Sequence, residues 1–435
     1  MIKELSTFCI CSMSFVLSNC NKASNNNTVQ PNEPAFVNTS HLDYLYTPVN
    51  FSTGTKAAGI YIYSEAPDYR LVGDINEGYT CVDDVARAAQ VYLRSSKYSS
   101  DTSIQSKALN LIRFILEMQS DNGYFYNFLF LNNQINKSGN TSINNPDWWS
   151  WRAMYTLMEA SPLIKNKDIQ LSNKIDVAVN KLIGKIKTDL VNIPKTTKVV
   201  NGITVPQWLP AGSGTDQAAL LILGLIPYCA ANNDPILISY IKKLADGIAM
   251  MQQGDATQFP YSSFLSWENT WHAYGCDQAY AMIKAGVFLN DAQYSNKGLA
   301  EVDNFYLWLL QTGMKSSFIV AKNGNQIQLQ SEKTYTQIAY GIRPMVSAAA
   351  EAYRITGQQK YADIAGHLAA WFFGDNVAGI KMYSQTTGRC FDGISSLTNV
   401  NQNSGAESTI EALLALQIVE SSPAIKTAFD KYKKP

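Results

Sequence analysis

Three aspartates occupy the same place in three similar segments of the chain. Asp84, Asp216 and Asp277 are each followed two residues later by an alanine and then by an apolar run, and Asp83 stands directly before Asp84. Two carboxylates that face one substrate can act as acid and base. Hydrolysis of a glycosidic bond needs such a pair, at about 5 Å or about 6.5–9.5 Å depending on the stereochemical course. The sequence therefore offers Asp84 and Asp277 as a catalytic pair, with Asp216 as the next candidate.

The same recurrence has a structural explanation. An aspartate at a helix start can accept hydrogen bonds from the free N–H groups of the first turn, and its charge is favoured by the positive end of the helix dipole. Within the Asp83–Asp84 pair, one carboxylate can cap the helix while the other binds substrate. Both interpretations of the repeated aspartates remain open at the level of sequence.

A segment around residues 264–275 combines aromatic rings with groups that can transfer a proton. It places Glu268 and His272 between Trp267 and Trp271. An indole can stack on a flat apolar face such as a sugar ring, while Glu268 or His272 handles a proton. The alternative is that the two tryptophans, four residues apart, only anchor a short turn.

A second aromatic segment and several isolated side chains complete the candidate binding residues. Residues 145–151 place Asp147 beside the indoles of Trp148 and Trp149, which either stack on a ligand or fill the core. Arginines on apolar helices form internal ion pairs or bind a substrate carboxylate. Further binding candidates are Tyr124, Tyr126, Arg152 and Arg343, with Tyr69 and Glu77 as weaker ones.

The elements that must position these residues form a sixfold repeat. Ala-rich apolar runs start near residues 84, 151, 216, 277, 341 and 407, in steps of 67, 65, 61, 64 and 66 residues. Such runs are typical of helices surrounded by protein, and the amphipathic segments between them are typical of helices with one solvated face. The amphipathic segments are 103–118, 168–186, 235–251, 291–310, 359–373 and 423–432. The chain is therefore predicted to be all-α, with six helical hairpins that close into a double ring.

This pattern resembles the six-hairpin glycosidase superfamily, whose fold is the (α/α)6 toroid, from about residue 40 to the C-terminus. Residues 80–88 (TCVDDVARA) are similar to the D-D-x-A-R-A helix start of carbohydrate-related toroids, and residues 123–128 with 151–153 are similar to the loop and second inner helix of that group. The resemblance implies that the inner helices are parallel and that a funnel opens where they begin.

Composition and motifs exclude several other classes. The chain of 435 residues has 35 basic and 35 acidic residues, so it lacks the basic excess of nucleic-acid-binding proteins. The three histidines, His41, His272 and His367, are too scattered for a zinc site, and no nucleotide-binding glycine motif occurs. We expect no metal or cofactor, no nucleic acid, and a monomer that binds an oligosaccharide or polysaccharide.

The N-terminus has the features of an export signal. Lys3 precedes a short apolar run at 8–17, and the ending LSNC at 17–20 resembles the lipobox of bacterial lipoproteins, in which Cys20 is acylated. The expected organisation is a signal at 1–20, a flexible tether at 21–40 and the toroid at 41–435. The protein is expected in the periplasm or at the cell surface, with the lipid as its sole membrane contact. The remaining cysteines show no paired spacing and are expected as buried thiols: Cys81, Cys229, Cys276 and Cys390.

These observations favour a glycoside hydrolase that uses carboxylates in a funnel at the inner-helix N-termini. A lyase or epimerase acting on uronic acids is the first alternative, and it requires Arg152 or Arg343 together with a Tyr or His base in the funnel. A glycan-binding lipoprotein without catalysis is the second alternative, because an aromatic rim also serves binding alone.

Overall fold

The computed structural model describes residues 35–435. The predicted signal with Cys20, and residues 21–34 of the predicted tether, lie outside the described residues. Residues 35–39 pack against the rest of the domain: the ring of Phe36 is buried against Phe373 and Phe429. The short helix α1 (Ser40–Leu45) follows.

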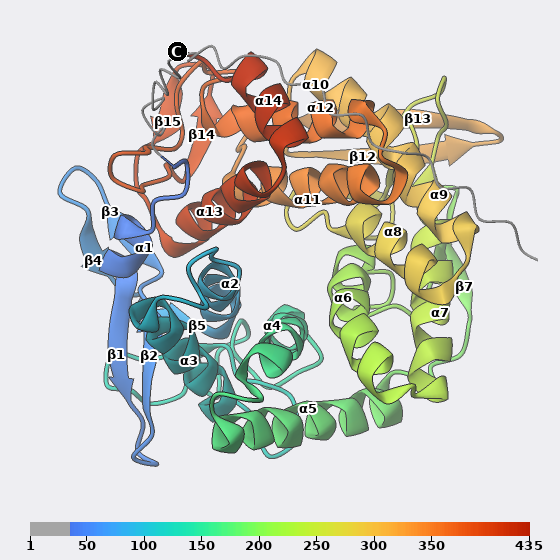
Figure 1. Ribbon diagram of the computed structural model, residues 1–435. Helices are drawn as coiled ribbons and strands as arrows, with labels where there is room; N and C mark the ends of the chain where they lie inside the picture. The colour runs from blue at the N-terminus through green and yellow to red at the C-terminus, as the bar shows by residue number, and fades with distance from the viewer. Residues whose placement is uncertain (1–34) are drawn as a thin grey trace, which may run out of the picture. The chain divides into compact units, whose positions relative to one another are not determined.

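Six apolar helices form a closed inner ring in the described domain, and each contacts the next, including the last with the first (Figure 1). They are α2 (Val82–Leu93), α4 (Trp148–Ile164), α6 (Thr215–Asn232), α8 (Gln278–Leu289), α11 (Ala339–Thr356) and α13 (Ala406–Ser421). Most of their residues are buried, as the Ala-rich pattern predicts for helices with protein on all sides.

A second set of helices packs outside this ring, one against each inner helix (Figure 1). They are α3 (Thr102–Glu117), α5 (Ile169–Asp189), α7 (Pro235–Met250), α9 (Ala292–Glu301), α12 (Gln359–Ala369) and α14 (Pro423–Tyr432). Past α9 the chain continues through a π-helical turn (Val302–Tyr306) into α10 (Leu307–Thr312), and past α12 through a 3₁₀ turn (Ala370–Phe372). The predicted (α/α)6 toroid of six hairpins is confirmed.

Aspartates cap four of the outer helices. Asp101, Asp168, Asp234 and Asp291 precede α3, α5, α7 and α9, and each accepts a hydrogen bond from backbone N–H groups of the first turn. The aspartates at the inner-helix starts behave differently: no side-chain cap forms at the N-termini of α2, α6 or α8. Asp216 nonetheless accepts from the Gln217 N–H at 2.6 Å, so a contact with the helix start accounts for Asp216 but not for Asp84 or Asp277, whose carboxylates are engaged by Arg87 and Arg343.

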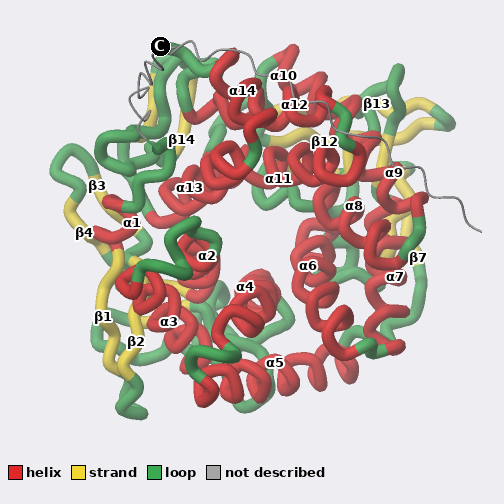
Figure 2. Tube along the Cα trace, viewed as in Figure 1, coloured by secondary structure: helices red, strands yellow, loops and turns green. Residues whose placement is uncertain are grey.

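Strands occur in short antiparallel hairpins and one three-stranded sheet, β11–β12–β13 (Figure 2). They precede α2 or lie in the segments that lead from an outer helix to the next inner helix, whereas the return connections are short. Their bounds are β1 (Tyr46–Asn50), β2 (Lys56–Ile60), β3 (Tyr63–Glu65), β4 (Arg70–Val72), β5 (Thr80–Cys81), β6 (Phe128–Leu129), β7 (Thr197–Val200), β8 (Ile203–Pro206), β9 (Gln252–Gln253), β10 (Ser263–Phe264), β11 (Thr270–His272), β12 (Ser317–Asn323), β13 (Gln326–Lys333), β14 (Gly393–Ser396) and β15 (Asn399–Asn401).

The inner helices all begin at one rim of the ring. Hydrogen bonds and ion pairs join their first turns: Asp83 to Arg152, Trp151 to Gln217, Gln278 to Thr215, Arg343 to Asp277, and Glu407 to Arg87. The long strand-bearing segments therefore collect at this rim. Among residues 35–435, none of the helices has both the length and the apolar character needed to span a bilayer.

One buried carboxylate lies among apolar side chains at the end of the outer helix α9. Glu301, where α9 meets the π-helical turn, is 3% exposed and accepts a hydrogen bond from the N–H of Phe264 at 2.7 Å. Burial raises the pKa of this carboxyl to about 8. The folded protein therefore binds a proton at Glu301 that the unfolded chain releases near pH 4.5.

This site makes stability depend on pH. Because the folded-state pKa lies above the unfolded one, the contribution of Glu301 is complete at acidic pH and is lost as pH rises toward 8, with a limiting slope of about 1.4 kcal/mol per pH unit. We expect Glu301→Gln to flatten this part of the pH dependence of the unfolding free energy, measured by urea denaturation. Glu117→Gln, on an outer helix, should keep the parental slope; an unchanged slope in Glu301→Gln would refute the assignment.

Candidate active site at the inner-helix N-termini

A fully buried carboxylate joins three inner helices at this rim. Glu411 of α13 accepts a hydrogen bond from Arg87 of α2 at 2.8 Å and from Arg343 of α11 at 2.6 Å. Burial alone would raise the pKa of Glu411, but the two guanidinium groups outweigh it and lower the pKa. Arg87 also contacts Asp84 at 2.7 Å, and Arg343 contacts Asp277 at 2.8 Å. We call this cluster of Glu411, Arg87, Arg343, Asp84 and Asp277 the central network.

The central network continues across the ring through a tyrosine. Arg152 of α4 pairs with Asp83 at 2.9 Å and donates to the hydroxyl of Tyr340, on α11. The guanidinium groups of Arg87 and Arg152 both lie over the Tyr340 ring, 5.0 Å from its centroid. In the ring order α4 and α11 stand opposite one another, so the lumen is bridged at this level.

A cavity of about 480 Å³, the rim cavity, opens on the N-terminal side of the central network. Four carboxylates line it: Asp83, Asp84, Asp392 and Glu407. Asp392 directly precedes β14. It accepts hydrogen bonds from the Gly405 N–H at 2.8 Å and from the Ser408 hydroxyl at 2.7 Å. These bonds orient Asp392 beside the first turn of α13, where Glu407 lies.

Three of the four carboxyls that line the rim cavity have raised pKa values. Burial raises the pKa of Glu407 to about 7, because its single cation contact, Arg87 at 3.4 Å, does not offset desolvation and the nearby charges of Asp84 and Glu411. Burial also raises the pKa of Asp84, although Arg87 opposes it, and that of Asp392. The Glu407 side chain is nonetheless 42% exposed. At neutral pH this carboxyl is therefore about half protonated, and a ligand can reach it.

A second cavity of about 290 Å³, the indole cavity, lies at the same rim. Trp148 and Trp267 line it together with Asp216 and His272, whose Nε2 lies 3.1 Å from the Asp216 carboxylate. The other imidazole nitrogen, Nδ1, is buried and has no hydrogen-bond partner among the described residues. Two aromatic residues and an imidazole–carboxylate pair thus share one opening.

The structure does not bring Asp84 and Asp277 into one cavity. Asp84 lines the rim cavity, whereas Asp277 lines a cavity on the other side of the central network. Asp277 is 1% exposed, and both of its oxygens accept from Arg343. A carboxylate held by a bidentate guanidinium is compensated and closed to a substrate. Asp84 and Asp277, which were expected to face one substrate, therefore do not share an opening.

Several predicted binding residues lie in the core. Trp271 stacks on Phe318 and is 1% exposed, and Trp149 is buried with its indole N–H on the Phe125 carbonyl. Tyr124 is buried, with its hydroxyl donating to Asp189. These side chains have no face open to a ligand.

Other predicted residues lie at the rim in structural contacts. Glu268 pairs with Lys198, and Asp147 accepts from the Trp148 N–H at 2.8 Å at the start of α4. Tyr126 is partly buried near Lys137. The Arg389 guanidinium lies over the ring of Tyr69, 3.8 Å from its centroid, and Glu77 accepts from the Thr141 hydroxyl at 2.7 Å.

Sequence reasoning overlooked Glu407, Glu411, Asp392 and Arg87 as site residues. Glu407 stands at the sixth repeat start, the position that Asp84, Asp216 and Asp277 hold in other repeats, so the repeat itself carried a signal for it. Glu411 lies one helical turn later on an apolar helix, and a charge there indicates a buried partner. Asp392 sits in an irregular segment and has no such signal.

The possible metal ligands and the cysteines can be placed in the described part of the chain. Within residues 35–435, no cluster of three or more His, Cys, Asp or Glu side chains is arranged to hold a metal ion. The four cysteines there, Cys81, Cys229, Cys276 and Cys390, are buried and free, as predicted.

Comparison with solved structures agrees with the fold. A sugar epimerase from a ruminal bacterium superposes with a TM-score of 0.61 at 12% identity, covering 88% of this chain and 95% of that chain. Cellobiose 2-epimerase from Bacillus thermoamylovorans B4167 has a TM-score of 0.57 at 12% identity, with the same coverage. An α-1,2-mannosidase from Trichoderma reesei has a TM-score of 0.50 at 14% identity, covering 78% and 74%. The chain shares the (α/α)6 toroid with these proteins.

Similarity at the level of sequence is absent from the comparisons. No family model matches the chain. No curated protein matches it either. The match to a GH127 β-arabinofuranosidase, with a TM-score of 0.47, spans 77% of this chain and about half, 51%, of that chain.

Removal of the shared carboxylate should destabilise the protein strongly. Glu411→Gln leaves Arg87 and Arg343 buried with less compensating charge, and breaking a buried ion pair costs about 3–5 kcal/mol. We expect a loss of this size in the unfolding free energy from chemical denaturation. Glu159→Gln provides the matched control, because its pair with Arg94 is partly exposed and should be worth at most about 1 kcal/mol. Equal losses in the two variants would contradict a central role for Glu411.

Proposed function

We propose that the chain is a carbohydrate-active enzyme and, more specifically, a glycoside hydrolase that works in the rim cavity with Glu407 as proton donor. One observation carries the proposal: an accessible carboxyl with a pKa raised to about 7 lies in a cavity lined by three further carboxylates. A general acid must still carry its proton at the working pH, and a hydrolase needs a second carboxylate opposite it.

Asp83 is our choice for the second carboxylate. It is adjacent to the lumen bridge, its side chain is 22% exposed, and Arg152 at 2.9 Å compensates its charge. Asp84 is less accessible, because it is 3% exposed and engaged by Arg87. Asp392 has a raised pKa and hydrogen bonds that fix its orientation, which suits it to hold a substrate hydroxyl.

The indole cavity supplies a second place for a sugar ring. Trp267 is 45% exposed and Trp148 is partly buried, so each presents part of an aromatic surface on which a pyranose or furanose can stack. A substrate of at least two sugar units would occupy both cavities. Export of the protein, with Cys20 as lipid anchor, is part of this proposal and would bring the enzyme to glycans outside the cytoplasm.

Sugar epimerisation is the second candidate, favoured by the His272–Asp216 pair. An imidazole that lines an open cavity and has Nε2 beside a carboxylate is suited to transfer a proton through that nitrogen. Uronic acids are disfavoured as substrates, because Arg152 and Arg343 are both occupied by carboxylates of the chain. An epimerase would incorporate solvent deuterium into the recovered sugar, and His272→Asn would abolish that exchange.

Replacement of the proposed acid should remove hydrolysis but not binding. On a panel of oligosaccharides, with reducing ends as the readout, we expect Glu407→Gln to lower kcat by about 10²–10⁴-fold, the usual contribution of a general acid, with little change in KM. The loss should be smaller on dinitrophenyl glycosides, whose leaving group needs no protonation. Glu117→Gln should retain parental activity. Full activity in Glu407→Gln would refute the proposed acid, and binding without turnover by the parent would favour a glycan-binding protein.

Activity should fall on the alkaline side as Glu407 loses its proton. Since its pKa is raised to about 7, the acid form dominates below that pH, and kcat/KM should drop about tenfold per unit above it. The measurement is kcat/KM for a dinitrophenyl glycoside and for an oligosaccharide between pH 5 and 9. The alkaline limb should appear with the oligosaccharide and be weak with the activated glycoside. A limb of equal size with both substrates would assign the titration to another group.

A further inference from the structure

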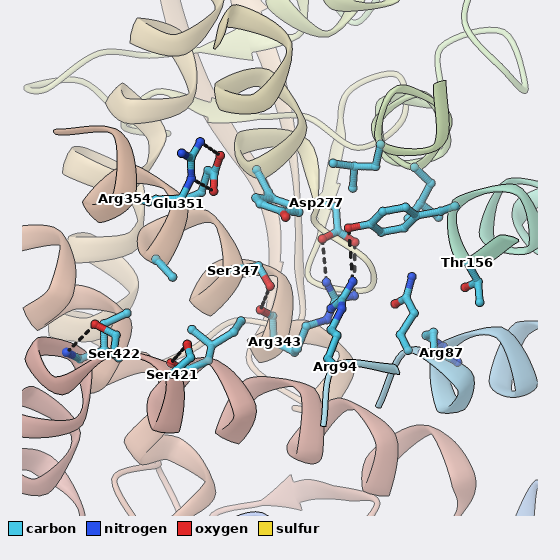
Figure 3. A pocket seen from close by; sticks show the side chains of 18 of the residues that line it. Arg87, Arg94, Thr156, Asp277, Arg343, Ser347, Glu351, Arg354, Ser421 and Ser422 are labelled. Carbon is cyan, nitrogen blue, oxygen red and sulfur yellow. Dashed lines mark hydrogen bonds and ion pairs between the residues drawn. The ribbon is translucent and has the colours of Figure 1, made fainter. Parts of the chain in front are cut away.

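A cavity of about 480 Å³, here called the lumen cavity, lies on the far side of the central network from the rim cavity (Figure 3). Arg87, Arg152, Asp277 and Arg343 line its inner end, and residues from the C-terminal ends of the inner helices line its mouth. The mouth residues include Arg94 after α2, Arg354 at the end of α11 and Ser421 at the end of α13. Short connections surround this mouth, so it is separate from the strand-bearing rim.

The charges around the lumen cavity are compensated within the protein. Arg354 binds Glu351 through two hydrogen bonds of 2.7 and 2.8 Å, as Figure 3 shows. Arg94 binds Glu159 in the same two-point manner. At the inner end, Arg343 is engaged by Asp277 and Glu411. A ligand that brings its own charge would have to displace one of these pairs, so the lining favours a neutral molecule.

One buried residue of this lining has a polar group without a partner among the described residues. Gln90 of α2 is 5% exposed and lines the cavity, and its amide makes no hydrogen bond with any described residue. The amide atoms are not fully enclosed by protein, so they face the open space of the cavity, where a ligand can reach them. The amide presents both donors and an acceptor, and a hydroxyl group complements such a combination.

The remaining lining suits a small ring with an apolar face. Tyr155 and Tyr280 lie on adjacent sides of the lumen with Leu220 and Leu223. Aromatic rings next to planar amide and guanidinium groups provide stacking and hydrogen bonds together. The volume falls within the range of about 300–1,000 Å³ that is typical of small-molecule sites.

We propose that the lumen cavity binds a neutral, polyhydroxylated molecule of monosaccharide size, with Gln90 as the polar contact that selects hydroxyl groups. The site is distinct from the proposed active site and does not depend on it. Arg87 lines both cavities, so a ligand in the lumen cavity contacts a residue that also holds Asp84 and Glu407.

The test is titration of the full chain with neutral aldoses (glucose, galactose, mannose, xylose and arabinose), followed by calorimetry and ligand-observed NMR. We expect binding of at least one of them that becomes at least tenfold weaker in Gln90→Leu, which removes the amide but keeps the volume. Ala350→Leu should also weaken binding, because Ala350 is a partly exposed lining residue and the larger side chain fills the cavity. Neither change touches the central network.

Two controls separate this site from the rim cavity. Ala231→Leu places the same change on an exposed position at the end of α6, outside the lumen cavity, and should leave binding at the parental level. Ser395→Leu, which narrows the rim cavity from β14, should also leave it unchanged. The proposal is overturned if no aldose binds, if Gln90→Leu and Ala350→Leu bind as the parent does, or if binding is lost in Ser395→Leu alone, which would place the sugar in the rim cavity.

Discussion

The arrangement of the inner ring depends on one interaction. The Glu411 carboxylate accepts hydrogen bonds from the guanidinium groups of Arg87 and Arg343. A carboxylate without solvent exposure is unfavourable by several kcal/mol unless cations reach it. Arg87 and Arg343 come from the two inner helices that flank α13, and they reach Glu411 only when α13 lies between them. The same interaction therefore closes the ring at the point where its last helix meets its first.

This closure decides which carboxylates remain available for chemistry. Arginines that serve Glu411 also engage Asp84 and Asp277, and Arg152 engages Asp83 and Tyr340 across the lumen. Glu407 stands at the edge of the network, with one cation contact at 3.4 Å, and so keeps a raised pKa together with an accessible side chain. The network also divides the lumen, which leaves one cavity at the strand-bearing rim and another at the opposite mouth.

The sequence predicted the helices well, because the hydrophobic pattern of each helical hairpin is repeated along the chain. The outer helix expected at 423–432 coincides with α14, and the one expected at 235–251 ends one residue away from α7. The aspartate repeat marked the rim at which the inner helices begin, but Asp84 and Asp277 line different cavities, and Asp277 is enclosed by Arg343. Trp267 and Trp271, equivalent by spacing, separate into an exposed and a buried indole, since β11 directs Trp271 against Phe318.

The sequence by itself determined the helical hairpins and their number, because hydrophobic periodicity and the sixty-odd-residue repeat are local properties. Tertiary structure alone decided which carboxyl group at the rim has a pKa near neutral pH. That outcome depends on burial and on the distances from Glu407, Asp84 and Asp277 to arginines placed on neighbouring helices. Electrostatic energies vary steeply with both quantities, and contacts such as Glu411 to Arg87 join residues more than three hundred positions apart, which no local pattern encodes.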